Sequence, residues 1–266
     1  MKTILKVMTS ILVLMIITSI IPISTFAAEE TNESIGIDNV EIWDGSVASA
    51  FGGGDGTESN PYIISNGAEL AYFSKRVVNG SFSGKHFRMT KNIVLNDYSD
   101  WNSWNKSSGP SNILTPMYHE GSNSSLYNCI FDGGGYTILG YYSKEGGLFS
   151  IMKNFTLKNL NLEASYIYSK NSTGAFMGSV WGCHLSNLHS SATVETEYSA
   201  AGIISCAYEG TTISNCSNSG HILAKDYAAG IAGTFKDCTS TLAIAKNDNQ
   251  NSVLTRITIN YLPQNE

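Results

Sequence analysis

Acidic side chains in the C-terminal half of the chain have the clearest potential for chemistry. Glu195, Glu197 and Asp226 are carboxylates of the type that a glycoside hydrolase or polysaccharide lyase needs, as a pair or cluster with a basic partner. Lys170, Glu197 and Lys225 follow one another in steps of 27 and 28 along the sequence. This spacing also suits ion pairs on a solvated face, at up to ~1 kcal/mol per pair, which we take as the better explanation.

Other catalytic arrangements are missing from the sequence. A zinc protease needs His-Glu-x-x-His, but His119-Glu120 is followed by Gly121, Ser122 and Asn123, and no other His precedes a Glu. The sequence also contains no phosphate-binding loop and no Ser, His and Asp arrangement with elbow glycines. We therefore expect no metal, no cofactor and no enzymatic activity.

A long irregular segment, 96–127, interrupts the pattern of short strands and is rich in aromatic residues. Loops of this length are often functional, and aromatic rings give hydroxyl-rich ligands a large contact area. We predict that a ligand binds here. An alternative is that the aromatic rings plug the loop onto the rest of the fold. The candidate ligand-binding residues are Tyr98, Trp101, Trp104, Tyr118 and His119.

The elements that must position these residues recur at a regular interval along the sequence. Three asparagines recur in steps of 28, and a glycine followed by apolar residues recurs in steps of 27, 28 and 28. The two series are Asn159, Asn187 and Asn215, and Gly147, Gly174, Gly202 and Gly230. A fixed period of this size indicates a solenoid, in which each repeat buries its apolar face against its neighbours.

The repeat has the pattern of strands. Within 174–201, apolar patches of four or five residues alternate with Ser, Gly, Asn and Thr, as at Ala192, Val194 and Thr196. No stretch has the apolar spacing of an amphipathic helix. We therefore predict an all-β fold, a right-handed parallel β-helix with ~28-residue coils, about five or six in number.

The asparagine series predicts a structural ladder. Equivalent residues of stacked coils lie ~4.8 Å apart, so each amide can donate to the next. We expect Asn159, Asn187 and Asn215 to point inward and stack. The alternative is that asparagine is present because it favours turns.

A helix at 66–78 is expected to cover the first coil. Asn66 can cap it, with Glu69 reaching back to the cap. Leu70, Phe73 and Val77 then share one face. A solenoid must cover its terminal coil, and an amphipathic helix is suited to this.

The predicted organisation has four parts. Residues 1–27 are a signal peptide, 28–41 a flexible leader, 42–84 the N-terminal cap, and 85–266 the β-helix with the excursion 96–127. A strand at 253–262 is expected to close the C-terminal end.

The first residues resemble a secretory signal. Lys2 and Lys6 precede an apolar run, 7–21, and small residues at the −3 and −1 positions favour cleavage after Ala27. An uncleaved membrane anchor is the alternative, but the run is shorter than the ~20 apolar residues that a span requires. We expect the protein to be secreted or held at the cell surface.

Charge limits the partners. The net charge is −6, and loss of Lys2 and Lys6 lowers Lys plus Arg from 16 to 14 against 22 Asp plus Glu, which gives −8. An acidic, charge-poor surface argues against nucleic acid and anionic membranes as partners. Membrane contact is expected only through an uncleaved anchor.

The five cysteines include no CxxC pair, so a zinc knuckle is not expected. Cys216 occupies the position that Leu160 and Leu188 fill in the earlier repeats, which predicts a small buried hydrophobic residue. A disulfide between Cys206 and Cys238 across adjacent coils is left open.

The chain from about 43 to 241 resembles the GLUG-motif family of secreted bacterial β-helix proteins. The resemblance rests on Gly-Asp-Gly-Thr-Glu at 54–58, Asn-Pro-Tyr-Ile-Ile at 60–64, the glycine-rich segment 131–138 and the repeated glycine motif. Only its second and fourth copies keep the closing glycine, Gly178 and Gly233. The resemblance implies a β-helix; such modules occur in adhesin-like surface proteins and beside the catalytic domains of immunoglobulin-cleaving metalloproteases.

Two functions follow as hypotheses. The first is a non-catalytic extracellular β-helix that mediates adhesion or binds carbohydrate or another host ligand. The alternative is an enzyme that degrades polysaccharide with Glu195, Glu197 and Asp226.

Overall fold

The structure is a computed structural model that describes residues 40–79, 82–117, 128–236 and 238–245. The chain divides into two compact units, Met1–Asp38 and Asn39–Glu266, and every described residue belongs to the second. The predicted signal peptide, most of the leader and the predicted strand at 253–262 lie outside the described residues.

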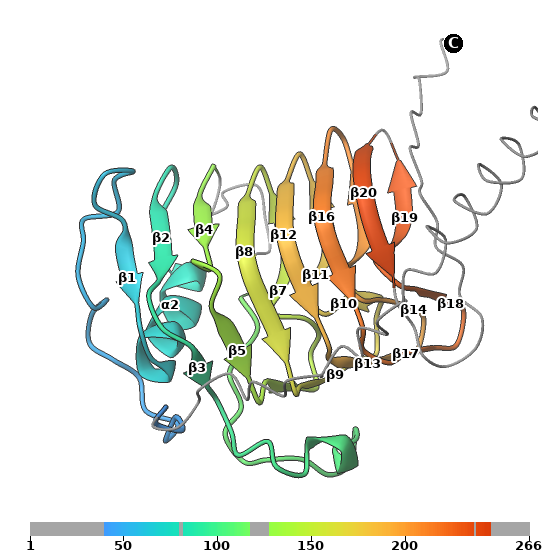
Figure 1. Ribbon diagram of the computed structural model, residues 1–266, viewed down its shortest axis with the longest axis horizontal. Coiled ribbons are helices and arrows are strands. Elements are labelled where there is room, and N and C mark those ends of the chain that lie inside the picture. The colour runs from blue at the N-terminus through green and yellow to red at the C-terminus, as the bar shows by residue number, and fades with distance from the viewer. Residues whose placement is uncertain (1–39, 80–81, 118–127, 237, 246–266) are drawn as a thin grey trace, which may run out of the picture. The chain divides into compact units, whose positions relative to one another are not determined.

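The second unit is a parallel β-helix of about six turns, which confirms the predicted fold class. Its largest sheet has nine strands, and Figure 1 shows most of them side by side along the solenoid. They are β1 (Tyr62–Ile64), β2 (His86–Met89), β3 (Ile93–Val94), β4 (Ile130–Asp132), β5 (Thr137–Leu139), β8 (Thr156–Glu163), β12 (His184–Ser190), β16 (Thr212–Asn218) and β20 (Thr239–Ala245).

Three smaller sheets complete the coils. One contains β6 (Tyr142–Ser143), β9 (Tyr166–Ser169), β13 (Thr193–Thr196) and β17 (Ile222–Ala224). A second contains β7 (Phe149–Lys153), β11 (Met177–Trp181), β15 (Ile204–Tyr208) and β19 (Ala232–Lys236). The third contains β10 (Thr173–Gly174), β14 (Ser199–Ala201) and β18 (Tyr227–Ala229).

The pairing register reproduces the period read from the sequence. Ser186 of β12 lies beside Lys158 of β8 on one side and Ser214 of β16 on the other, each of them one repeat away along the chain. Apolar residues of successive coils therefore fall in columns that face one core, among them Leu157, Leu185 and Ile213. The glycine series has a steric reason as well, because a Cβ at Gly147, Gly174 or Gly202 would overlap backbone atoms of the following coil.

The helix α2 (Gly67–Asn79) covers the core of the first coils. Phe73 is fully buried and its ring centroid lies 4.6 Å from that of Phe87 and 5.5 Å from that of Phe131. The Asn66 side chain accepts the backbone N–H of Glu69 at 2.9 Å, as predicted. The expected return contact is displaced by one residue, because the Glu69 carboxylate accepts the Ser65 N–H at 2.6 Å and the Ser65 hydroxyl at 2.9 Å.

Asn159 and Asn187 stack as predicted, but the expectation that the asparagines point inward is wrong. Asn187 donates to the side-chain oxygen of Asn159 at 2.8 Å, and Asn159 donates to the Asp132 carboxylate at 2.9 Å. Asn187 and Asn215 are exposed, so this ladder lies on the outer face of the nine-stranded sheet. The three asparagines have φ of 55°, 54° and 50°.

This left-handed backbone explains the outward direction. A left-handed residue breaks the two-residue alternation of a strand, so Leu157 and Leu160 both face the core although they are three residues apart. Asparagine tolerates this conformation better than other non-glycine residues. Asparagine therefore recurs at these positions for two reasons. Its amide forms the ladder, and its backbone accepts the left-handed conformation that also makes asparagine common in turns.

Substitutions at Asn187 can separate the two effects. Asn187→Ala is expected to lower the free energy of unfolding by about 1–2 kcal/mol, since it puts a Cβ on a left-handed residue and removes the amide. Asn187→Gly removes the same amide but accepts the backbone, so its loss should be less than half as large. Denaturant titration of both variants measures the difference. Equal losses would contradict the backbone explanation.

Four of the five cysteines are buried, and Cys206 is half-buried. Burial raises the pKa of Cys183 to about 12 and that of Cys216 to about 11, so both thiols stay protonated at neutral pH. The disulfide considered between Cys206 and Cys238 is not formed. Cys206 of β15 lies opposite Thr234 of β19.

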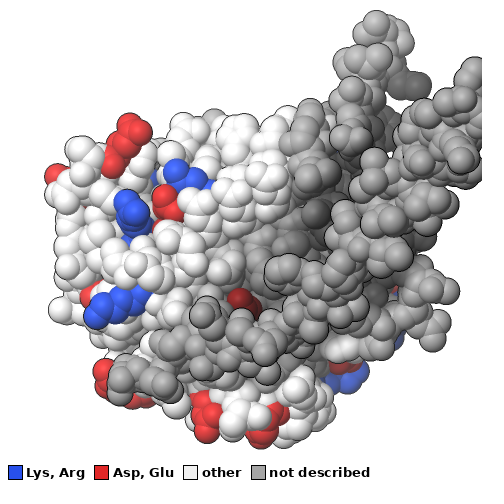
Figure 2. All heavy atoms as spheres, in the orientation of Figure 1, with Lys and Arg blue, Asp and Glu red and all other residues white. Residues whose placement is uncertain are grey.

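Figure 2 shows a few scattered charged side chains among the described residues of this face, most of which are uncharged. One ion pair on the nine-stranded sheet joins Lys158 and Asp132 at 3.6 Å. This sparse distribution agrees with the low charged content, 14% of all residues.

Candidate functional site

The first part of the described excursion, 98–106, packs on the β6–β9–β13–β17 sheet through contacts with Tyr142, Tyr166 and Glu195. It contains a short 3-10 helix, η1 (Trp101–Ser103). Directly after η1, Trp104 is only 7% exposed and its ring meets that of Tyr142 edge-on, with centroids 5.9 Å apart. The Trp104 indole N–H donates to Asp100 Oδ1 at 3.1 Å, and the Tyr142 hydroxyl donates to the Asn105 carbonyl at 2.9 Å. Trp104 therefore anchors the loop to the sheet.

Tyr98 and Trp101 are placed differently from Trp104. Both pack against the buried cluster of Trp104, Tyr142 and Tyr166, yet both remain only half-buried. Among the described residues, they are the predicted ligand-binding aromatics that are not buried. Tyr118 and His119 lie outside the part of the chain that the structure describes.

The two glutamates of the alternative hypothesis lie on the same sheet face, beneath the loop. Glu195 is on β13 and Glu197 follows its end. The Tyr166 hydroxyl donates to Glu195 Oε2 at 2.5 Å, and Lys106 Nζ of the loop donates to Glu195 Oε1 at 3.1 Å. We call the group of Glu195, Glu197 and the tyrosines and lysines that contact them the Tyr–Glu cluster; its members are Tyr166, Tyr168, Lys106, Lys225, Glu195 and Glu197.

Glu197 is equally well paired. The Tyr168 hydroxyl donates to its Oε1 at 2.9 Å, Lys225 forms an ion pair with its Oε2, and Lys106 Nζ lies 3.8 Å from its Oε1. The ion pair predicted between Glu197 and Lys225 is therefore present.

Two other residues that the sequence offered for chemistry, Lys170 and Asp226, lie at exposed positions. Lys170 is exposed at the end of β9. Asp226 is also exposed, and its backbone N–H donates to the Tyr198 carbonyl at 3.1 Å. The structure thus brings together two of the three predicted acids.

The protonation states follow from these contacts. Hydrogen bonds from Lys225 and then Tyr168 lower the pKa of Glu197 below its ordinary value. Donation to Glu197 raises the pKa of Tyr168, and donation to Glu195 raises that of Lys106. Burial, reinforced by its hydrogen bond to Glu195, raises the pKa of Tyr166 far above its usual range.

At neutral pH the cluster accordingly holds an ionised Glu197, neutral tyrosines and charged lysines. A general acid needs a carboxyl group whose pKa is raised toward the working pH, and the pKa of Glu197 is shifted the other way. The arrangement is best suited to fixing the loop on the sheet.

The sequence did not identify Tyr166, Tyr168 or Lys106 as candidate site residues. A signal for the tyrosines was present, because Tyr168 precedes Glu195 by one coil and pairs with it in register. Lys106 had no comparable signal, since it lies 89 residues from Glu195 within an irregular segment.

The described residues contain no group of three or more His, Cys, Asp or Glu side chains that could hold a metal ion. No helix within that part of the chain is long and apolar enough to cross a membrane.

No model of a known protein family matches this chain. A region of 144 residues, 51% of this chain, is 31% identical to a protein of Evansella cellulosilytica described as "Putative Gly-rich membrane protein", and it spans only 15% of that protein's length. A crystal structure of "a putative immunoglobulin A1 protease" from Bacteroides ovatus is similar over 78% of this chain and 83% of that one, with 14% identity and a TM-score of 0.37. A likeness at that score carries no argument about activity.

Proposed function

We propose that this protein is a non-catalytic, extracellular β-helix module that binds carbohydrate through the excursion loop. One observation carries the proposal: Trp104 and Lys106 fix the loop to the β-helix, while Tyr98 and Trp101 are not buried. A ring held in place before binding loses little conformational freedom when it contacts a sugar. Trp101 is the principal contact in this proposal.

The Tyr–Glu cluster supports a structural role for the acids. Each carboxylate oxygen of Glu195 and Glu197 already accepts from a tyrosine or a lysine, so a substrate or an attacking water would have to share that oxygen with an existing partner. Cleavage of a polysaccharide by these carboxylates would first require the loop to release Lys106.

An enzyme that degrades polysaccharide is the second candidate. It is favoured by one observation, the close approach of the Tyr166 hydroxyl to the Glu195 carboxylate beside a second acid. Tyrosine, carboxylate and lysine side chains are all able to transfer protons in such reactions.

The extracellular location rests on the signal-like sequence at 1–27. The relative from Evansella cellulosilytica is described as a membrane protein, which supports attachment to a cell surface as the setting of this module. Because the aligned region spans 15% of that relative, the partners of the longer protein do not transfer to this chain.

A glycan array tests the proposal. The mature chain, residues 28–266, is expected to be retained by a subset of neutral glycans, and Trp101→Ala should abolish retention. Tyr136→Ala is a matched control, because Tyr136 is 36% exposed and lies between β4 and β5, away from the loop. Retention by Trp101→Ala that equals retention by the unmodified chain, or no retention of any glycan by the unmodified chain, would overturn the proposal.

A further inference from the structure

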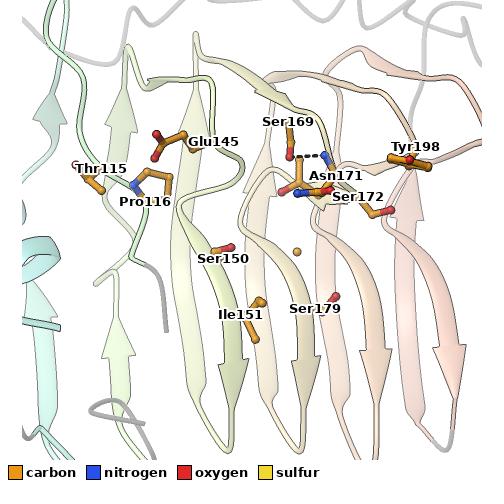
Figure 3. A pocket seen from close by; sticks show the side chains of 12 residues that line it. Thr115, Pro116, Glu145, Ser150, Ile151, Ser169, Asn171, Ser172, Ser179 and Tyr198 are labelled. Carbon is orange, nitrogen blue, oxygen red and sulfur yellow. Dashed lines mark hydrogen bonds between the residues drawn. The ribbon is translucent and has the colours of Figure 1, made fainter. Parts of the chain in front are cut away.

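A hollow lies on a different face of the β-helix from the one that Trp101 and Trp104 cover. It has a volume of about 750 Å³, within the ~300–1,000 Å³ usual for ligand sites, and Figure 3 shows the side chains that line it. Its floor is formed by the β7 and β11 strands, and one end is formed by Thr115 and Pro116, where the excursion returns to the coils. We call it the serine groove.

Three of the four floor residues are small, namely Ser150, Gly178 and Ser179. Ser179 of β11 lies opposite Ile151 of β7, and the preceding residues, Gly178 and Ser150, also line the groove. A Cβ at Gly178 would lie 3.0 Å from the Ser150 carbonyl, so the two strands are close at this point. Larger side chains in these columns would fill the space.

Polar groups and one aromatic ring form the wall. Asn171 and Ser172 lie at the turn between β9 and β10, and Tyr198 lies at the corresponding turn of the next coil. Tyr198 is 54% exposed, so its ring is available to a ligand in the groove. The Ser172 hydroxyl accepts from the Ser199 backbone N–H at 3.3 Å, which ties the two turns together.

The charge of the lining selects the ligand class. Glu145 is its one ionisable acid, and the described residues that line the groove include no lysine, arginine or histidine. A carboxylate in a lining whose described residues include no cation disfavours uronic acids, sulfates and phosphates. Serine, threonine and asparagine side chains each donate and accept, so they match ligands that carry many hydroxyl groups.

From this geometry we infer that the serine groove binds a neutral oligosaccharide, with one sugar ring against Tyr198 and its hydroxyls on the serine and asparagine side chains. The inference rests on the proposed function for the class of ligand but adds a second site, around the corner of the coil from Trp101. A polymer bound at both places would be held more tightly than at either alone.

Isothermal titration calorimetry with defined probes tests the site. Cellohexaose, chitohexaose and mannohexaose serve as neutral probes, and hexagalacturonate as the acidic one. Tyr198→Ala and Ser179→Trp are expected to weaken binding of the preferred neutral probe at least roughly tenfold, the first by removing the ring and the second by filling the groove. Tyr227→Ala is the matched control, since Tyr227 is 74% exposed on β18 and does not line the groove.

The outcomes separate this inference from the proposed function. If Trp101→Ala weakens binding while Tyr198→Ala and Ser179→Trp do not, the groove assignment is overturned and the loop proposal stands. If hexagalacturonate binds more tightly than every neutral probe, the ligand class is wrong. If the unmodified chain is retained on the glycan array but binds none of the neutral probes, the groove inference is overturned and the proposed function stands. Failure to bind any glycan on the array overturns the proposed function. Tyr198→Ala guards against misfolding of the bulkier variant, because it alters only an exposed side chain.

Discussion

Trp104→Ala is expected to lower the free energy of unfolding by about 3–5 kcal/mol, as for other buried aromatic residues cut to alanine. The side chain is 7% exposed, its ring packs on Tyr142, and its indole N–H is bonded to Asp100. For a protein of this size the loss corresponds to a fall in Tm of roughly 10 °C. The loop should separate from the sheet, and ligand binding should be lost with it.

Trp101→Ala is expected to affect ligand binding more than stability. Trp101 is more exposed than Trp104, so its removal should lower the free energy of unfolding and the Tm by less than the removal of Trp104. Ligand retention should nevertheless fall sharply. Thermal unfolding of the two variants, with binding measured on the same samples, makes the comparison. A fall in Tm for Trp101→Ala as large as that for Trp104→Ala would show that Trp101 is also a plug and would defeat the ligand-site assignment.

Gly202→Ala is expected to destabilise the β-helix by more than ~3 kcal/mol or to prevent folding. The added Cβ would overlap the Gly230 carbonyl of the next coil and the Asn218 side chain. A flexible side chain can move aside, but the Gly230 carbonyl is backbone and is held by the stacking of the coils. The backbones of the two coils would have to move apart at this point to make room for the added methyl group.

Gly210→Ala is the control for this effect. Gly210 has φ of +73°, and a Cβ there would meet nothing within 4 Å. Its replacement should cost only the ~1–2 kcal/mol of a left-handed alanine. Circular dichroism during chemical denaturation measures both variants. Comparable losses at the two positions would contradict close approach of the coils as the reason for the glycine series.

The fold was predictable because its signals repeat. One glycine or one asparagine says little, but each recurs at the same interval, and in a solenoid that interval is the distance along the chain to the neighbour in the next coil. The same regularity made Cys216 recognisable as a core residue, because Leu160 and Leu188 fill the equivalent position. The repeat period and the positions of the apolar columns can both be read directly from the sequence.

The direction of the asparagines was not predictable from the period. It depends on a local left-handed backbone, which inserts an extra residue into the alternation of β8, β12 and β16. The spacing of three between Leu157 and Leu160 was the available clue, since a regular strand would place them on opposite faces.

The candidate site was only partly predictable for a different reason. The excursion has no period, so the sequence could identify its aromatic residues but not which of them would be buried. Trp101 and Trp104 are three residues apart and of the same type, yet tertiary contact with Tyr142 buries one and leaves the other half-buried. The pairing of Lys106 with Glu195 is equally a matter of where the loop settles.

Recovery of the glycan after prolonged incubation tests the central claim, binding without cleavage, most directly. The mature chain is incubated with the glycan that it retains on the array, and the glycan is then analysed by mass spectrometry and for unsaturated and reducing ends. We predict that it is recovered intact, with the Glu197→Gln variant giving the same result. Shortened or unsaturated products that disappear with Glu197→Gln would contradict the account and would assign the Tyr–Glu cluster to catalysis.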